Sequence, residues 1–413
     1  MGPLAGIKVL DLSNFLAAST AGRVMAEWGA DVIKIEPPAG DTYRNNGPYM
    51  GIPIYDRGRK GNPSYDNENG NKKWVAINLK DPDGNKVFHR LLAKADVLIT
   101  NYREGALRKL NISYDDLKEQ YPRLVYGTIL GYGPKGPLKD KPGFDYTAFY
   151  ARSGLMADAA PRGEDLLNTV AGLGDHFSAI SLVAGINAAL LERDRTGKGN
   201  LVQASLFQAG TFALSSGYLS AYSGKPWPRT RLEPNNSTSN TYRCKDGEWF
   251  YLAATAYDVL WPKVAEKVLN RPDLATDPRF ATRKAVEDQG TMEEQVRIMD
   301  EIFATKTYAE WAKIMTDADI AFEKAQHFTE VVKDPQALDN EYIFYHTYSN
   351  GKKAPFAHAP ARIGNEQWPE FEPAKLTGTD TEAILLDLGY SKEEIAKLMK
   401  KGSIAGEKIT VKG

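Results

Sequence analysis

The sequence predicts an α/β protein, with a doubly wound, Rossmann-like large domain and a smaller α+β domain. Three observations lead to this prediction. Short apolar segments alternate with helical segments in the first half of the chain. The first strand, helix and strand fit within about 30 residues, the size of a parallel βαβ unit. The length of 413 residues exceeds what one hydrophobic core usually organises, so we expect two domains.

The expected elements follow from residue periodicity and from turn signals. Strands are predicted at 7–12, 31–36, 96–100, 125–130 and 201–206, and helices at 17–28, 86–93, from Ser113, and at 176–193. Turn-forming residues gather just after residue 222. We therefore predict residues 1–222 as the first part of the large domain, 223–325 as the small domain, and 326–413 as a return segment that completes the large one.

Charge and cysteine content exclude several classes of protein. Lys and Arg total 52 against 53 Asp and Glu, so no net field favours nucleic acid or an anionic membrane. The one cysteine, Cys244, cannot form an internal disulfide and is expected to be structural. The N-terminus lacks the pattern of a signal peptide, and no stretch approaches 18 apolar residues. We expect a cytoplasmic protein that spans no membrane.

The segment Gly172-Leu173-Gly174-Asp175 precedes the clearest apolar helix. Two interpretations of Asp175 stay open on these residues alone. As an N-cap, it would accept hydrogen bonds from the first free N–H groups of the helix. As a nucleophile, it would attack a bulky substrate that the glycines admit, with the helix N-terminus stabilising an oxyanion and the helix dipole keeping the carboxylate ionised.

The rest of the chain gives weaker signals for ligands. Residues 14–20 lack G-x-G-x-x-G, which argues against a nicotinamide dinucleotide, although the helix that follows could still receive a phosphate or an adenine. No two of the five histidines have metal-ligand spacing, so no metal site is predicted. Basic residues that could neutralise ligand phosphates are Lys72, Lys73, Arg103, Arg108, Lys109, Lys139 and Lys141.

Several short stretches occur in the order typical of one enzyme family. They are 4–11, 29–36, 71–73, 95–97, 105–107, 131–137, 172–175, 196–199, 277–280 and 388–390. Together they resemble the class III CoA-transferase family, the formyl-CoA and carnitine CoA-transferase group, over nearly the whole chain. The resemblance implies a large domain assembled from both chain ends, two interlocked subunits, and acyl-CoA as a substrate with no tightly bound cofactor.

The resemblance also implies a mechanism and binding residues. Asp175 stands at the position of the family's aspartate, which forms an acyl anhydride and then an aspartyl-CoA thioester. Phe15, Leu16 and Ala17 match the loop on the adenine side, Asn101 matches a pocket asparagine, and Lys109 and Lys141 match basic residues near the phosphates.

Departures from the family pattern bear on the substrate. Pro37 replaces an arginine of some members, and the segment 235–240 replaces the glycine loop of members that act on oxalate. Racemases of the same fold have a His-Asp pair where this chain has Phe144-Asp145, and phenylalanine cannot move protons.

Within the family, the segments 101–104, 143–146 and 239–242 resemble those of transferases of anaerobic amino-acid fermentation. Those enzymes activate (R)-2-hydroxy acids such as phenyllactate or 2-hydroxyisocaproate. Phe144, Tyr146 and Phe149 could line an apolar pocket or could belong to the core. An α-methylacyl-CoA racemase-like isomerase and a catalytically silent CoA-binding protein are the alternative hypotheses.

Overall fold

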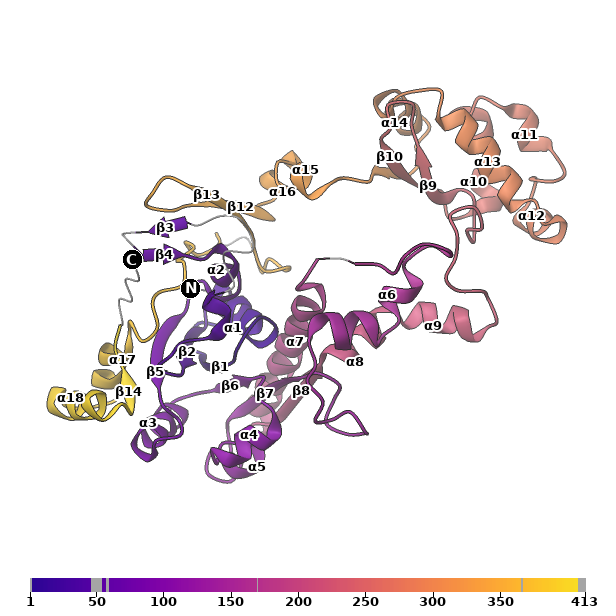
Figure 1. The fold of residues 1–413 in the computed structure, drawn as a ribbon. Coiled ribbons are helices and arrows are strands. Elements are labelled where there is room, and N and C mark those ends of the chain that lie inside the picture. Colours follow the sequence, from indigo (N-terminus) through magenta and orange to yellow (C-terminus); the bar gives the residue numbers. More distant parts are fainter. Residues whose placement is uncertain (1, 46–53, 57–58, 169, 365–366, 408–413) are drawn as a thin grey trace. The chain divides into compact units, whose positions relative to one another are not determined.

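The computed structural model describes residues 2–45, 54–56, 59–168, 170–364 and 367–407. The chain divides into two compact units, each described here by itself (Figure 1). The first unit contains residues 1–155, 168–216 and 335–413, and the second contains residues 156–167 and 217–334. These limits replace the expected ones after residues 222 and 325, and the segment 156–167 belongs to the second unit.

A seven-stranded sheet forms the centre of the first unit, in the order β14-β5-β2-β1-β6-β7-β8. Its strands are β1 (Lys8–Leu12), β2 (Asp31–Glu36), β5 (Lys73–Ile77), β6 (Val97–Thr100), β7 (Val125–Leu130), β8 (Leu201–Ser205) and β14 (Ile404–Ala405). All pairs are parallel except the one between β14 and β5. The order of the parallel strands is that of a doubly wound sheet, so ligands are expected where it reverses, between β1 and β6.

Helices cover both faces of this sheet, as Figure 1 shows. On one face α1 (Ala17–Glu27) and α7 (Leu173–Thr196) share a core with Val9, Val32 and Val97. The other face is covered by α3 (Pro82–Leu92), α4 (Glu104–Lys109), α5 (Tyr114–Leu117), α17 (Thr381–Asp387) and α18 (Lys392–Lys401). Successive residues of a strand point to opposite faces, which is why Val9 belongs to the first core and Leu10 to the second.

Helix α7 is the central helix of the first face. Among the described residues it is the one helix that is long and apolar enough, by length and composition, to cross a membrane. The expectation that no segment approaches this requirement is therefore wrong for α7. Its buried side chains, such as Leu182, Val183 and Ile186, pack in the core with α1, and the core helix of a soluble protein passes the same test.

Shorter elements complete the first unit. They are η1 (Thr42–Asn45), α2 (Pro63–Asn69), η3 (Asp145–Ala151), α8 (Leu206–Ala213), α16 (Pro335–Asp339), and two hairpins made of β3 (Ile54–Asp56) with β4 (Arg59–Gly61) and of β12 (Ile343–Thr347) with β13 (Lys353–Ala357). Two further short helices, α6 (Leu155–Asp158) and α9 (Ser215–Tyr222), extend across the limits between the units.

The second unit has an antiparallel sheet of β9 (Ser239–Arg243), β10 (Trp249–Ala253) and β11 (Phe322–Lys324). The helices of this unit are α10 (Tyr257–Lys263), η4 (Val264–Val268), α11 (Pro272–Thr276), α12 (Arg283–Gln289), α13 (Met292–Phe303), α14 (Tyr308–Asp317) and α15 (Phe328–Val331). Cys244 lies buried in its aromatic core, and burial, with smaller contributions from Asp246 and Glu248, raises the pKa of the thiol to about 11. A thiol that stays protonated at neutral pH is a poor nucleophile, which agrees with a structural role.

Candidate functional site

The loop after β1 lies at the point where the strand order reverses. The N–H of Asn14 donates to Oδ1 of Asn101 at 3.0 Å, and Nδ2 of Asn101 donates to the carbonyl of Asn14 at 2.6 Å. Because Asn101 follows β6, this reciprocal pair joins the ends of two neighbouring strands. The next residue, Phe15, has a φ of +59°, and its N–H donates to Oδ1 of Asp41 at 3.3 Å. Asn101 therefore fixes the backbone of the predicted CoA loop.

Lys72, predicted as a CoA contact, belongs to the core beneath this loop. Its side chain has no exposed surface, and Nζ donates to Oδ2 of Asp11 at 2.8 Å and to the carbonyl of Ser19 at 2.7 Å. Nζ also lies within bonding distance of the carbonyl of Glu68 and of Oδ1 of Asn69. Since these four acceptors surround the ammonium group, no direction remains for a phosphate, and the prediction is wrong for Lys72.

Replacing Lys72 with methionine should destabilise the protein without directly removing a CoA contact. The change leaves the carboxylate of Asp11 buried beside fewer cations, which typically costs about 3–5 kcal/mol. Urea denaturation should therefore show a lower free energy of unfolding. The matched Lys109→Met variant, which changes an exposed lysine, should keep wild-type stability and bind acyl-CoA more weakly. Equal stability of both variants would contradict this assignment.

The other predicted basic contacts differ in position. Lys73 begins β5 and pairs with Asp31 at 2.7 Å, at the start of β2. Both residues lie at the amino ends of parallel strands, opposite the edge where the Asn14 loop lies, so the structure places Lys73 away from that loop. Arg108 is exposed on α4 and pairs with Glu104 at 2.7 Å. The other two predicted lysines, Lys109 and Lys141, are also exposed, and for them, as for Arg108, the prediction stands untested.

Another residue caps the helix that carries Asp175. Gly172 has a φ of +99°, and α7 begins at Leu173. The carboxylate of Asp145 accepts from the N–H of Gly172 at 2.6 Å and from the N–H of Gly174 at 3.0 Å. The N-cap interpretation of Asp175 is therefore wrong. No described residue donates a hydrogen bond to the Asp175 carboxylate, which leaves its oxygens available for chemistry.

The electrostatic surroundings of Asp175 differ from those expected of a helix N-terminus. Burial raises the pKa of its carboxyl group to about 7, and the charges of Asp145 and Glu68 act in the same direction. The opposing influence is the neighbouring cation of His176. The expectation that the helix dipole keeps Asp175 ionised is thus corrected: burial and two carboxylates outweigh it.

A pH profile can test this environment. A carboxyl group attacks a thioester only when it is deprotonated, so kcat/KM should fall as the pH decreases through about 7. The fall should approach about tenfold for each pH unit on the acidic side, with a single ionisation. Initial rates between pH 5 and 9 at subsaturating acyl-CoA would measure it. An acidic limb near the ordinary pKa of an aspartate would contradict the burial of this group.

His176, the residue after Asp175, forms a pair with Glu68. Glu68 belongs to α2, is buried, and accepts from Nδ2 of Asn67 at 2.7 Å, from Oγ1 of Thr20, and from Nε2 of His176 at 3.1 Å. Burial would raise the pKa of Glu68, but the charge and hydrogen bond of His176 and the other two donors lower it to about 2. Conversely, burial opposes protonation of His176, and Glu68 more than offsets this, so its pKa is raised.

Sequence reasoning did not find this pair, because Glu68 and His176 lie 108 positions apart in regions without a motif. It also assigned Asp145 no function beyond its place in the segment compared with racemases.

The remaining predicted site residues surround the same helix start. The ring of Phe15 lies 5.9 Å from that of Tyr43 and 6.1 Å from that of Phe144. A Cβ atom at Gly172 would lie 3.5 Å from Cδ2 of Leu16, which places the loop beside the first turn of α7. Ala17, the first residue of α1, is buried. The structure therefore brings the predicted adenine-side loop and Asp175 together.

The aromatic residues proposed for a substrate pocket separate into two groups. Phe144 is 57% exposed, whereas Phe149 is buried and belongs to the core. Tyr146 is partly exposed and stacks on Tyr150 at 5.6 Å. Phe144 is therefore the strongest candidate for contact with a substrate side chain.

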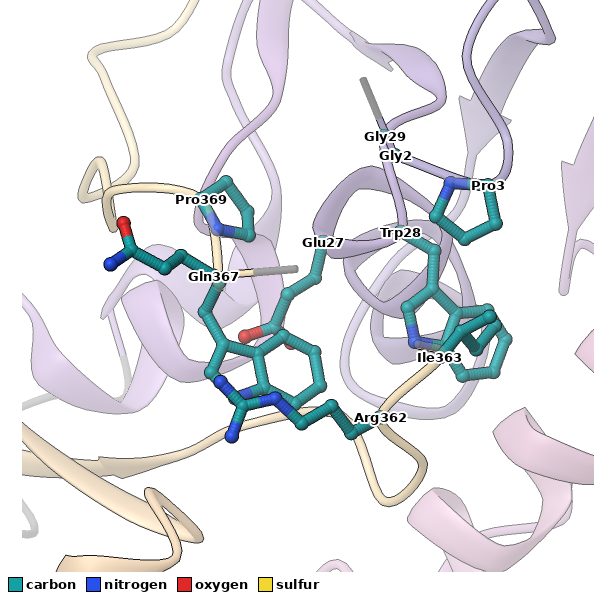
Figure 2. A pocket seen from close by; sticks show the side chains of 10 residues that line it. Gly2, Pro3, Glu27, Trp28, Gly29, Arg362, Ile363, Gln367 and Pro369 are labelled. Atoms are coloured by element: carbon teal, nitrogen blue, oxygen red, sulfur yellow. The ribbon is translucent and has the colours of Figure 1, made fainter. Parts of the chain in front are cut away.

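A cavity lies at the C-terminal end of α1, beside Glu27 and Trp28 (Figure 2). Its lining includes Glu27, Trp28, Arg362 and Trp368. Since α1 begins at the Asn14 loop and ends at Glu27, this cavity contains none of the groups assembled around Asp175.

Comparison with known proteins gives the family. The sequence model of CoA-transferase family III matches residues 4–381. The (R)-2-hydroxy-4-methylpentanoate CoA-transferase of Clostridioides difficile is 40% identical over 392 residues, which are 95% of this chain and 97% of that protein. The cinnamoyl-CoA:phenyllactate CoA-transferase of Clostridium sporogenes is 38% identical over 403 residues, 97% of each chain.

More distant relatives also match over nearly the whole chain. The human alpha-methylacyl-CoA racemase is 27% identical over 411 residues, 98% of each chain. A crystal structure of a CAIB/BAIF family protein from Brucella suis superimposes with a TM-score of 0.78 at 25% identity, covering 94% of this chain and 99% of that one. From the match over most of its length and its two relatives at 38–40% identity, the chain belongs to CoA-transferase family III.

Proposed function

We propose that this enzyme moves coenzyme A from an acyl-CoA thioester to an (R)-2-hydroxy acid such as phenyllactate or 2-hydroxyisocaproate. The observation that carries the proposal is the state of the Asp175 carboxylate. Asp145, and not Asp175, accepts the hydrogen bonds from the N–H groups at the start of α7. Asp175 is partly buried, and no described residue donates a hydrogen bond to its carboxylate. The acceptor class comes from the two relatives, whose names state a 2-hydroxy-4-methylpentanoate and a phenyllactate as substrates.

The proposed reaction needs no proton transfer and no energy input. The Asp175 carboxylate attacks the carbonyl carbon of the donor thioester, and CoA leaves as a thiolate. The thiolate then attacks the aspartyl carbonyl of the resulting anhydride, releasing the donor acid and leaving an aspartyl-CoA thioester. Attack by the acceptor acid reverses these steps. A thioester is exchanged for a thioester, so the protein must mainly position groups and stabilise oxyanions.

We propose that CoA binds at the edge of the seven-stranded sheet formed by the carboxyl ends of β1 and β6. Phe15, Leu16 and Ala17 form the loop that Asn101 holds there. The exposed Arg108, Lys109 and Lys141 are the proposed phosphate contacts, because each is a cation with a solvent-facing side chain. Phe144 is proposed to contact the side chain of the hydroxy acid.

The subunit is proposed to act as an interlocked homodimer in the cytoplasm, in amino-acid fermentation. Exposed apolar side chains on α7 and α8 support association: Leu173 is 48% exposed, Leu191 64% and Phe212 74%. Isolated exposed apolar residues are ordinary, but several large, strongly exposed apolar side chains along α7 and α8 favour burial against another chain. Light scattering of the purified protein would measure the assembly state.

A CoA-ester racemase is the second candidate, favoured by the full-length similarity to the human enzyme. Phe144 argues against it, because a phenyl ring has no group that can donate or accept a proton near neutral pH. Incubation with acyl-CoA donors and a panel of hydroxy and plain acids, followed by mass spectrometry, separates the two. Transfer to (R)-2-hydroxy acids supports the proposal. Exchange of the α-hydrogen with deuterium in the absence of an acceptor, without transfer, would favour the racemase.

A further inference from the structure

We infer that His176, held by Glu68, binds the carboxylate of the acceptor acid beside Asp175 and so makes the enzyme select anionic acceptors. This inference rests on the proposed function and adds a residue that determines the acceptor class. Glu68 is a positioning residue in this scheme, since it acts through the imidazole ring.

The first argument is the placement of the ring. Nε2 of His176 lies 3.1 Å from Glu68, so that bond uses one of its two nitrogens. No described residue bonds to Nδ1, and the side chain is 45% exposed, whereas that of Glu68 is 4% exposed. The ring also lies against the first turn of α7: a Cβ atom at Gly172 would be 3.6 Å from Cε1. A buried carboxylate therefore holds an imidazole whose other N–H is free for a ligand.

The second argument is the balance of charge. Burial raises the pKa of Asp175 most, and the charges of Asp145 and Glu68 raise it further, so the site disfavours anions. An acceptor acid arrives as an anion and must lie within bonding distance of the aspartyl carbon. The cation that acts on Asp175 among the described residues is His176. Glu68 favours its protonated form, which supplies a charge-assisted donor for the incoming carboxylate.

The step that this contact assists is balanced in atoms and electrons. One oxygen of the acceptor carboxylate forms a C–O bond to the carbonyl carbon of the Asp175–CoA thioester, and the C–S bond breaks to release the CoA thiolate. The thiolate then forms a C–S bond with the acceptor carbonyl carbon, and the anhydride C–O bond breaks to return the Asp175 carboxylate. No proton is transferred, so His176 acts as a hydrogen-bond donor throughout.

The test compares a charged and a neutral acceptor. Enzyme loaded with acyl-CoA forms the enzyme–CoA thioester, which intact-mass spectrometry follows as it is discharged by (R)-phenyllactate or by neutral hydroxylamine. His176→Gln removes the cation and keeps an amide donor near Glu68. It should raise the half-saturating concentration of phenyllactate about tenfold or more and leave discharge by hydroxylamine unchanged. Glu68→Gln should raise the half-saturating concentration of phenyllactate by a smaller factor and should likewise leave discharge by hydroxylamine unchanged.

The control is His89→Gln, which changes a histidine on α3 that bonds to Tyr121 and lies outside the site. It should behave as wild type with both acceptors. Equal slowing of both acceptors in His176→Gln would indicate a structural role and overturn the inference, as would unchanged discharge by phenyllactate. If the wild type forms no enzyme–CoA thioester, or Asp175→Ala still forms one, the proposed function itself fails, which is a distinguishable result.

Discussion

Asp175→Ala should abolish CoA transfer, with a loss of at least about 10³-fold in kcat. The alanine side chain has no oxygen that can form an anhydride or a thioester. The measurement is the formation of acceptor-CoA together with the intact mass of the protein after incubation with acyl-CoA. Wild type should gain the mass of covalently bound CoA, and the variant should not.

Asp194→Asn supplies the matched control for this loss. Asp194 is an exposed carboxylate on the same helix as Asp175, about five turns away, and should be replaceable without effect on transfer.

Asp175→Asn adds a second measurement, the free energy of unfolding as a function of pH. Burial and two carboxylates raise the pKa of Asp175 above its unfolded value, so the charged form destabilises the folded state at high pH. The asparagine variant should therefore be more stable than wild type at pH 8, with a gain on the order of 1 kcal/mol that vanishes near pH 4. Transfer activity retained in Asp175→Ala would remove this residue from the mechanism.

Gly174→Ala should damage both stability and activity. A Cβ atom at this position would lie 2.2 Å from Cγ of Phe149 and 2.3 Å from Oδ1 of Asp145. Both neighbours are held in place, Phe149 by the core and Asp145 by its bonds to the start of α7. Overpacking of this kind costs about 1–3 kcal/mol, and weakening the cap adds about 1 kcal/mol.

The effect on activity should exceed the effect on folding. A displacement of Asp175 by about 1 Å can cost about 10²-fold in rate, because the carboxylate must lie in line with the thioester carbon. Thermal denaturation and kcat should be measured together with Gly105→Ala as the control. Nothing lies within 4 Å of a Cβ atom at Gly105, and this exposed position in α4 should tolerate alanine with equal or greater stability. Wild-type activity in Gly174→Ala would show that the helix start adapts without moving Asp175.

Several strands and the catalytic candidate could be predicted from local pattern. The strands β1, β2, β6, β7 and β8 are short segments rich in Val, Leu and Ile, which is typical of a parallel sheet with both faces covered. Strand β5 is not among the predicted strands, although residues 74–77 form an uninterrupted apolar run. Strand β14 has two residues, and its existence depends on pairing with β5. Such a short strand forms only through its tertiary contact with β5, and two residues are too few to show a periodic pattern in the sequence.

By itself, the sequence determined the α/β class, the order of the main elements, the family resemblance, and Asp175 as the residue to test. Tertiary structure decided which charges are free. Lys72 and Asp175 are both charged residues near expected ligand positions. The ammonium group of Lys72 donates to four buried acceptors, whereas the carboxylate of Asp175 accepts from no described donor. Asp145 and Glu68, distant in sequence, determine the hydrogen bonds and the pKa values around α7. Burial and hydrogen bonding depend on what surrounds a side chain in space, and residue order alone does not contain that information.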